Sequence, residues 1–245
     1  MPPRAAPRRN SPESAASAAK GPRSDFVRPK TAQQAVAEEL RRDITSGKLA
    51  PGSWIVQESL AEQFGMSRIP IREALKTLEA EEYITYVPHS GYRVAKLGLD
   101  ELLEVFRLRD ILEEELIRDA MPAVTEEIVD QMREQMAEMD RAAAENDLVS
   151  VGLANRKFHF LTFERSGLAR TKRIVTQLWN TADAYRPMYA HLMDLNQING
   201  EHVLLVEAMA AHDVEKTVTL NHEHRGHAID HLREVFGREA AEADS

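Results

Sequence analysis

Three histidines and one asparagine fall where helical periodicity turns their side chains toward the interior. Asn155 and His159 are four residues apart and project from one face of a helix, while His202 and His224 occupy inward positions of two further helices. Buried polar groups are costly unless they are bonded, and a shared divalent cation would satisfy all four side chains together. Imidazole and carboxamide ligands suit zinc, nickel or manganese. The alternative, histidines hydrogen-bonded within an ordinary core, fits the same periodicity equally well.

A second group of residues is cationic. Arg68 and Arg72 lie one helical turn apart, and Lys76 continues the same face, opposite an apolar stripe. Two arginines in the first turn of a helix oppose its macrodipole. A phosphate or a guanine edge would remove that conflict and accept a bidentate guanidinium contact. The alternative is a charged face that is only solvated.

The stretch LAEQFGMSRIPIREAL, residues 60–75, has the spacing of a helix-turn-helix motif. Gly65 permits the turn, Ser67 is the expected N-cap of the second helix, and Pro70 falls in its first turn, where a missing N–H costs nothing. The predicted elements of this part are helices over about 31–47, 57–64 and 68–81, and hairpin strands over 83–87 and 92–94.

Beyond residue 98 the sequence has only helical periodicity, which predicts an antiparallel helical bundle. Pro187 is expected to break or kink its fourth helix. The predicted helices run over about 100–120, 125–145, 147–165, 168–194, 197–212 and 213–236, with N-caps at Asp100, Thr125, Asp147 and Asp213. The expected fold class is therefore mostly α, an N-terminal winged helix-turn-helix followed by a C-terminal all-α bundle.

The charge of the chain is unevenly distributed. The 245 residues carry a formal net charge of −9, yet residues 1–28 hold 6 basic and 2 acidic side chains, and residues 29–97 hold 9 of each. The acidity lies in residues 98–245, with 16 basic and 29 acidic side chains. A nucleic-acid partner remains compatible with the acidic average, because a local cation cluster meets the phosphates.

Cysteine is absent, which excludes disulfides, thiolate catalysis, iron–sulfur clusters and Cys-ligated zinc, and fits a reducing compartment. No apolar run approaches the ~18 residues of a membrane span. The basic N-terminus has no apolar segment of the kind found in secretory signals. A cytoplasmic protein with no membrane partner is expected.

The region from Ala35 to Val94 resembles the winged helix of GntR-family bacterial transcription regulators. The resemblance is carried by Leu60-Ala61, Ser67-Arg68, Pro70-Ile71-Arg72-Glu73-Ala74-Leu75, Leu78 and Gly91. It implies that Arg68 and Arg72 enter the major groove of double-stranded DNA, with Pro70 and Lys76 beside them and Ser67 on a phosphate. The wing around His89 and Gly91 would lie along the minor groove.

The region from Leu102 to Val235 resembles the FCD ligand-binding domain of the FadR-type subgroup. The matching pieces are Arg109-x-x-Leu112-Glu113, Asn155-x-x-Phe158-His159, Glu201-His202, Asp213 and His224. In that subgroup an Asp or Asn and three His hold a divalent metal, which implies Asn155, His159, His202 and His224 here. Asn155 stands where Asp is common, and His227 is an alternative to His224. About six helices make the domain more similar to the VanR-type branch.

An ion with four protein ligands keeps one or two positions open, where a small carboxylate effector would bind. The resemblance points to Arg109 as an effector contact. A helix-surface ion pair with Glu113, four residues away, explains Arg109 equally well. Tyr185 and Arg186 lie beside Pro187 and are further candidates at the border of the pocket.

The resemblance implies a homodimeric, nucleoid-associated transcription regulator that is either a repressor or an activator. It would read a pseudo-palindromic operator, and an organic acid bound at the metal would control its operator affinity. We hypothesise that the effector re-poses the first bundle helix and acts on the DNA-binding domains through the short link Leu97–Asp100. The expected parts are a disordered basic tail (1–28), a winged helix-turn-helix DNA-binding domain (29–97), a helical effector- and metal-binding and dimerisation domain (98–238) and a frayed tail (239–245).

The competing hypothesis is a metal-dependent enzyme domain fused to a DNA-binding domain. Metal-assisted hydrolysis needs a placed general base. Glu201 is the nearest candidate in sequence, but it projects about 100° away from His202 on their helix. The chain has no HExxH or GxSxG motif. We therefore expect no catalytic residues and no enzyme.

Overall fold

The helix pair predicted around residues 60–75 is present in the computed structural model, which describes residues 31–243. The chain from Ala32 onward forms one compact unit. The predicted tail 1–28 lies outside the described residues.

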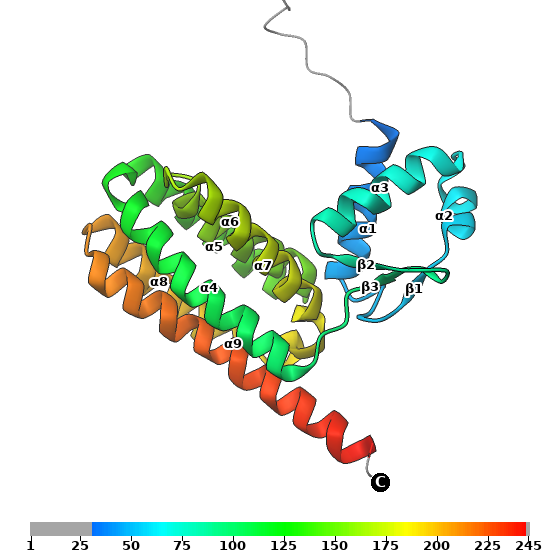
Figure 1. Cartoon of the computed structure of the whole chain (residues 1–245). Coiled ribbons are helices and arrows are strands. Elements are labelled where there is room, and N and C mark those ends of the chain that lie inside the picture. The colour runs from blue at the N-terminus through cyan, green and yellow to red at the C-terminus, as the bar shows by residue number, and fades with distance from the viewer. Residues whose placement is uncertain (1–30, 244–245) are drawn as a thin grey trace, which may run out of the picture. The chain divides into compact units, whose positions relative to one another are not determined.

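The first part of the described chain is a winged helix. Its elements are α1 (Ala32–Thr45), β1 (Trp54–Ile55), α2 (Gln57–Phe64), α3 (Arg68–Ala80), β2 (Ile84–Val87) and β3 (Gly91–Val94) (Figure 1). Helix α2 ends where Gly65 adopts a left-handed φ of 60° and donates its N–H to the Glu62 carbonyl at 3.1 Å. Helix α3 buries the predicted stripe of Ile71, Ala74, Leu75 and Leu78.

The three strands form an antiparallel sheet in the order β1-β3-β2. Trp54 pairs with Arg93, and Ile84 pairs with Val94. The hairpin between β2 and β3 is confirmed, and its tip has positive φ at His89 (63°) and Gly91 (103°). Strand β1 was not predicted, because two residues show no alternation that a sequence pattern can reveal.

The second part is a bundle of six α-helices within the described residues. They are α4 (Leu99–Ala120), α5 (Glu126–Ala144), α6 (Leu148–Phe163), α7 (Ala169–Tyr189), α8 (Leu195–Ala210) and α9 (Val214–Ala243), with short 3₁₀ turns at Met121–Ala123 and Ala190–Leu192. In Figure 1, α4 and α9 lie side by side along the bundle, in agreement with the many contacts between them.

Most helix ends lie within two residues of the prediction, and two differ by more. Pro187 lies inside α7, which ends at Tyr189 rather than near residue 194. A proline removes one helical hydrogen bond and clashes with the preceding turn, and α7 ends two residues later. Helix α9 continues to Ala243, so residues 239–243 of the predicted frayed tail have helical backbone.

Side-chain caps fix most of the bundle's helix starts. Thr125 and Asp147 accept hydrogen bonds from the backbone N–H groups three residues on, as does Asp213 from Lys216. The predicted cap at Asp100 is wrong, because α4 begins one residue earlier and the Glu101 carboxylate accepts the Gly98 N–H at 2.9 Å. Asp194, which was assigned to the end of the preceding helix, caps α8 instead.

Two hydrophobic cores support these elements. One fills the winged helix around Leu40 and Leu75, and includes Phe106 of α4 and Tyr185 of α7. The other fills the bundle around Phe158, Trp179 and Leu205. The inward histidines lie at this second core, where the Phe158 and His202 rings are 4.4 Å apart between centroids.

Candidate functional site

The outer face of α3 presents its cations to solvent. The side chains of Arg68, Arg72 and Lys76 are 72%, 58% and 55% exposed, opposite the buried stripe. Their partners are surface carboxylates: Arg68 lies 3.2 Å from Glu58, and Lys76 lies 3.2 Å from Glu73. Exposed ion pairs of this kind contribute about 0–1 kcal/mol, so an incoming phosphate can replace the carboxylate at little cost.

The remaining predicted residues of this surface are also accessible. Ser67 is at the predicted N-cap position of α3, exposed and with extended backbone, but its hydroxyl does not accept a capping bond from the first turn of this helix, and Pro70 lies in that turn as predicted. His89 is exposed at the hairpin tip, two residues before the half-buried Gly91. Sequence reasoning overlooked Ile69, whose apolar side chain is 66% exposed next to Arg68. The sequence pattern could have identified Ile69, because it is an apolar residue outside the buried stripe of α3.

The bundle brings three predicted histidines together. His159 comes from α6, His202 from α8 and His224 from α9, and one ring nitrogen of each lies within 4.8 Å of the others. His159 and His202 are 4% and 0% exposed. Inward positions on three separate helices therefore converge at one point.

The surroundings of the cluster fit a cation. Both ring nitrogens of His202 are buried and have no hydrogen-bond partner among the described residues, a costly state for imidazole. Burial, followed by the neighbouring His224 ring, holds the pKa values of His159 and His202 well below the usual range. Both rings are therefore neutral near pH 7, the form in which imidazole binds metal ions.

The fourth predicted ligand, Asn155, lies one turn before His159 on α6 and is 5% exposed. Asn155, His159 and His224 line the same cavity, which has a volume of about 40 Å³. His227 also lines this cavity, but its side chain is 41% exposed and it lies outside the cluster of three histidines. The geometry therefore favours His224 over His227 as the third histidine.

Arg109 forms an ion pair with Glu113, but the pair is buried rather than on the helix surface. Arg109 Nε lies 2.8 Å from Glu113 Oε1, and their side chains are 7% and 1% exposed. Three further groups bind the Glu113 carboxylate: Trp179 at 2.7 Å, Asn221 at 3.2 Å, and the guanidinium of Arg225. Burial alone would raise the pKa of Glu113, but Arg225 and Arg109 together lower it to about 2.

Three guanidinium groups lie at the wall of the cavity, and each is paired with a carboxylate. Arg109, Arg186 and Arg225 line it, together with one carboxylate, Glu113. Coulomb interactions are stronger in a buried environment than in water, so a guanidinium group that exchanges its partner here can bind an anion. A carboxylate is the anion that guanidinium groups bind in a bidentate manner.

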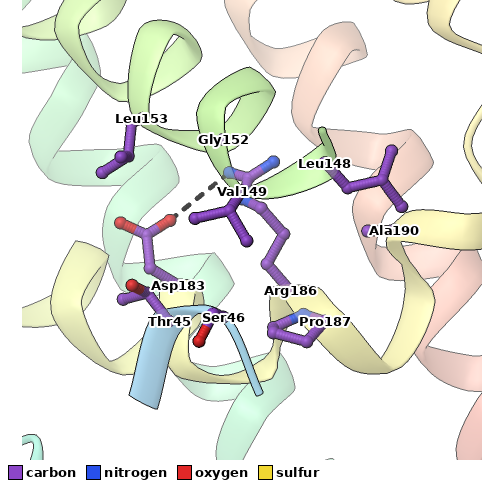
Figure 2. A pocket seen from close by; sticks show the side chains of 10 residues that line it. All are labelled: Thr45, Ser46, Leu148, Val149, Gly152, Leu153, Asp183, Arg186, Pro187 and Ala190. Carbon is purple, nitrogen blue, oxygen red and sulfur yellow. Dashed lines mark hydrogen bonds and ion pairs between the residues drawn. The ribbon is translucent and has the colours of Figure 1, made fainter. Parts of the chain in front are cut away.

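Arg186 lines the histidine cavity and also neighbouring ones. Besides the histidine cavity it borders a mainly apolar one of about 160 Å³, where it reaches from α7 toward Val149 and Gly152 of α6 (Figure 2). A Cβ on Gly152 would lie 3.0 Å from Arg186 Cδ, so the glycine leaves room for this side chain. Its ion pair with Asp183 is long, at 3.4 Å, and its buried Nε has no hydrogen-bond partner in the part of the chain that the structure describes.

Tyr185 has a different environment from the one predicted. It is 1% exposed and is absent from the residues that line the histidine cavity. Its hydroxyl accepts the Leu97 N–H and lies 3.4 Å from the Leu97 carbonyl. Tyr185 thus binds the link between the winged helix and α4.

Sequence reasoning missed the roles of two charged residues in this region. Arg225 is 5% exposed and binds Asp110 and Glu113, although nothing in its own helix pattern indicates a buried charge. Glu201 was judged as a general base and set aside, but its carboxylate binds His224 Nδ1 at 2.8 Å. This role depends on the packing of α9 against α8, which the sequence of α8 alone does not indicate.

A winged helix with an exposed cationic helix, joined to a helical bundle with a polar cavity, defines a DNA-binding transcription regulator. Residues 32–94 match the model of the bacterial regulatory proteins of the gntR family, and residues 104–227 match that of the FCD domain. The chain belongs to the gntR family and is a transcription regulator with a helix-turn-helix domain and an FCD domain.

Named relatives agree with this assignment. The HTH-type transcriptional regulator McbR of Escherichia coli (strain K12) is 28% identical over 59% of this chain and 65% of its own length. The uncharacterized HTH-type transcriptional regulator BphR of Paraburkholderia xenovorans (strain LB400) is 27% identical over 83% and 86%. The solved structure of E. coli McbR/YncC, 24% identical, has the same fold, with a TM-score of 0.76 over 84% of this chain and 99% of that one. No helix among the described residues is long and apolar enough to cross a membrane.

Proposed function

We propose that this regulator binds its operator through α3 and the wing, and that a small carboxylate bound at a divalent metal sets its operator affinity. The observation that carries the proposal is His202, which lies next to His159 and His224 and whose two buried nitrogens have no hydrogen-bond partner within residues 31–243. The proposed metal ligands are Asn155, His159, His202 and His224.

On the DNA side, Arg68 and Arg72 are the proposed base-reading residues. Their guanidinium groups are exposed one turn apart at the start of α3, where a helix enters the major groove end-on. The apolar side chain of Ile69 is suited to contact a thymine methyl group. Ser67, Pro70 and Lys76 border this surface, and His89 and Gly91 would approach the minor groove.

In the bundle, the metal would supply a cationic anchor with open coordination positions. The chain's own residues then determine which anion binds. Arg109 is held by Glu113 and Trp179, so its guanidinium is preorganised at the cavity wall. Arg186, which is only weakly paired, is free to change partner from Asp183 to a carboxylate. The histidine cavity, at about 40 Å³, is suited to a small organic acid.

Coupling to DNA would pass through the link at Leu97. Tyr185 of α7 binds the backbone of Leu97, directly before α4, which carries Arg109. A carboxylate that favours one position of α4 would therefore act on the link. Such a ligand changes operator affinity only by its differential affinity for the two states. Two copies, related by a two-fold axis, would read a pseudo-palindromic operator as a homodimer.

The metal proposal is tested by elemental analysis of the full chain after dialysis against zinc, nickel or manganese. Wild-type protein should retain about one ion per chain, whereas His159→Ala should lose it. The matched control is His191→Ala, since His191 is exposed and lies outside the cluster. Full occupancy in His159→Ala protein would overturn the assignment.

The effector proposal needs a second measurement. Small organic acids should raise the thermal midpoint of the metal-loaded chain, because a ligand of the folded state stabilises it. Chelation should abolish this shift. Arg109→Lys should lower the affinity for the acid about tenfold, because lysine lacks the bidentate fork. An operator affinity that no metal-bound acid changes would contradict the regulatory role.

A further inference from the structure

The carboxylate of Glu201 lies between α8 and α9, next to the histidine cluster. Its Oε2 is 2.8 Å from Nδ1 of His224, in hydrogen-bond geometry. Gln197, one turn earlier on α8, donates its amide N–H to Glu201 Oε1 at 3.1 Å. The carboxylate is therefore held in place from its own helix while it contacts a residue of the next one.

This contact determines which nitrogen of His224 can face the cluster. An ionised carboxylate only accepts hydrogen bonds, so the bonded Nδ1 of His224 must carry the proton. The lone pair of neutral His224 is then on Nε2, the nitrogen left for a ligand. Carboxylate–histidine pairs of this type orient metal-binding imidazoles and increase their basicity.

His227 does not take the same role. Its Nδ1 lies 2.9 Å from Glu201 Oε1, but the two atoms are not aligned as a hydrogen bond, and this Nδ1 has no other hydrogen-bond partner among the residues described. Its Nε2 instead lies 3.2 Å from the Gln197 amide. Of these two histidines, His224 is therefore the one that forms a hydrogen bond with Glu201.

Charge gives Glu201 a second effect on the cluster. Three imidazoles and the Asn155 amide form a neutral ligand set, and the guanidinium groups of Arg109 and Arg225 line the same cavity. The anion of Glu201 lies one hydrogen bond from the cluster and opposes the field of these two cations. A divalent cation would therefore bind more weakly without it.

We propose that Glu201 is a positioning residue that fixes the Nε2-donor form of His224 and supplies the negative charge that the neutral ligand set lacks. The proposal rests on the metal site of the proposed function and adds to it a residue outside the ligand set. Glu201 acts through His224 and is not itself a ligand.

The test is a metal titration of the full, chelator-treated chain with Zn²⁺ or Ni²⁺ alone, by calorimetry against a competing chelator. Glu201→Gln keeps an acceptor and removes the charge, whereas Glu201→Ala removes both. Both should lower affinity, by about 10- to 100-fold, with one ion still bound per chain at saturation. The control is Glu223→Gln, the same change at an exposed residue next to His224 in sequence, which should stay within about twofold of wild type.

The second readout needs no metal. Nitrogen-15 spectra of the imidazoles in the apo chain should show His224 with its proton on Nδ1, and Glu201→Ala should shift this ring toward the other tautomer. Unchanged affinity and an unchanged tautomer in Glu201→Ala protein would overturn the proposal while leaving the metal site intact. A wild-type chain that binds no divalent ion would overturn both this proposal and the metal part of the proposed function.

Discussion

The guanidinium of Arg109 lies over the indole ring of Trp179, with its central carbon 3.9 Å from the ring centroid. Both side chains also donate to the same oxygen, Oε1 of Glu113, at 2.8 Å and 2.7 Å. The cation is therefore fixed by a ring face and a carboxylate together. Arg109 is presented to the cavity in one orientation, and Glu113 is the residue that maintains it.

Replacement of Glu113 by glutamine should strongly destabilise the fold. Two buried guanidinium groups, Arg109 and Arg225, would lose their shared counter-charge. Breaking a buried ion pair from one side costs about 3–5 kcal/mol. Urea unfolding of the full chain should show a loss of this size, whereas Glu115→Gln, at an exposed position of the same helix, should change the free energy of unfolding by less than about 0.5 kcal/mol. A small effect at Glu113 would mean that the two arginines find other partners.

Arg72→Ala should relax sequence discrimination at one base pair of each half-site. A bidentate contact to a base is worth about 1–3 kcal/mol of discrimination. Binding to an operator and to its single-base variants should be compared at fixed salt concentration. Arg141→Ala, an exposed residue of α5, serves as the control for loss of one positive charge. Uniform weakening across all variants would instead identify Arg72 as a phosphate contact.

Tyr185→Phe should reduce the coupling between effector and operator. The change removes the hydroxyl that binds Leu97 and keeps the ring in the core. We expect a loss of about 0.5–1.5 kcal/mol in stability, the usual net value of one hydrogen bond. The ratio of operator affinities with and without a metal-bound acid should approach one, while affinity for the acid remains. A ratio equal to that of wild type would mean that the bond between Tyr185 and Leu97 does not carry the coupling.

The metal-free chain should lose stability as the pH falls below about 6.5. Burial lowers the pKa values of His159 and His202 well below the usual range, so these rings stay neutral in the folded chain while the unfolded chain binds protons. Unfolding is then favoured on acidification, by up to about 1.4 kcal/mol per pH unit for each histidine. Urea unfolding in chelator between pH 7.5 and 5.5 measures the slope. His202→Leu should reduce it, and a flat profile in the wild type would contradict neutral buried rings.

Local periodicity was sufficient for much of this molecule. The stripe of α3 and the inward positions of His159 and His202 depend only on which face of one helix is apolar, and the structure buries them all. Helix ends marked by a capping side chain, such as Asp147, were also found. Asp100 misled the prediction, because an acidic residue in the first turn resembles a cap.

What the sequence did not reveal depends on pairs of helices. Burial of Arg225 follows from Asp110 and Glu113 on α4, more than 100 residues earlier, and no pattern within α9 indicates it. Glu201 was judged by its angle from His202 on the same helix, whereas its partner is on α9. Tyr185 was placed by its proximity to Pro187 in sequence, but its hydroxyl reaches Leu97.

The carboxylate of Glu113 has a consequence for how the bundle opens. Its partners come from α4, α7 and α9, up to 112 residues apart in sequence. None of these helices can detach alone without exposing or orphaning a charge, so the three should fluctuate as one cooperative unit. Hydrogen exchange of the core amides in α4, α7 and α9 should then report one common free energy of opening. That of α5 should be lower, because none of the bonds described joins α5 to this carboxylate.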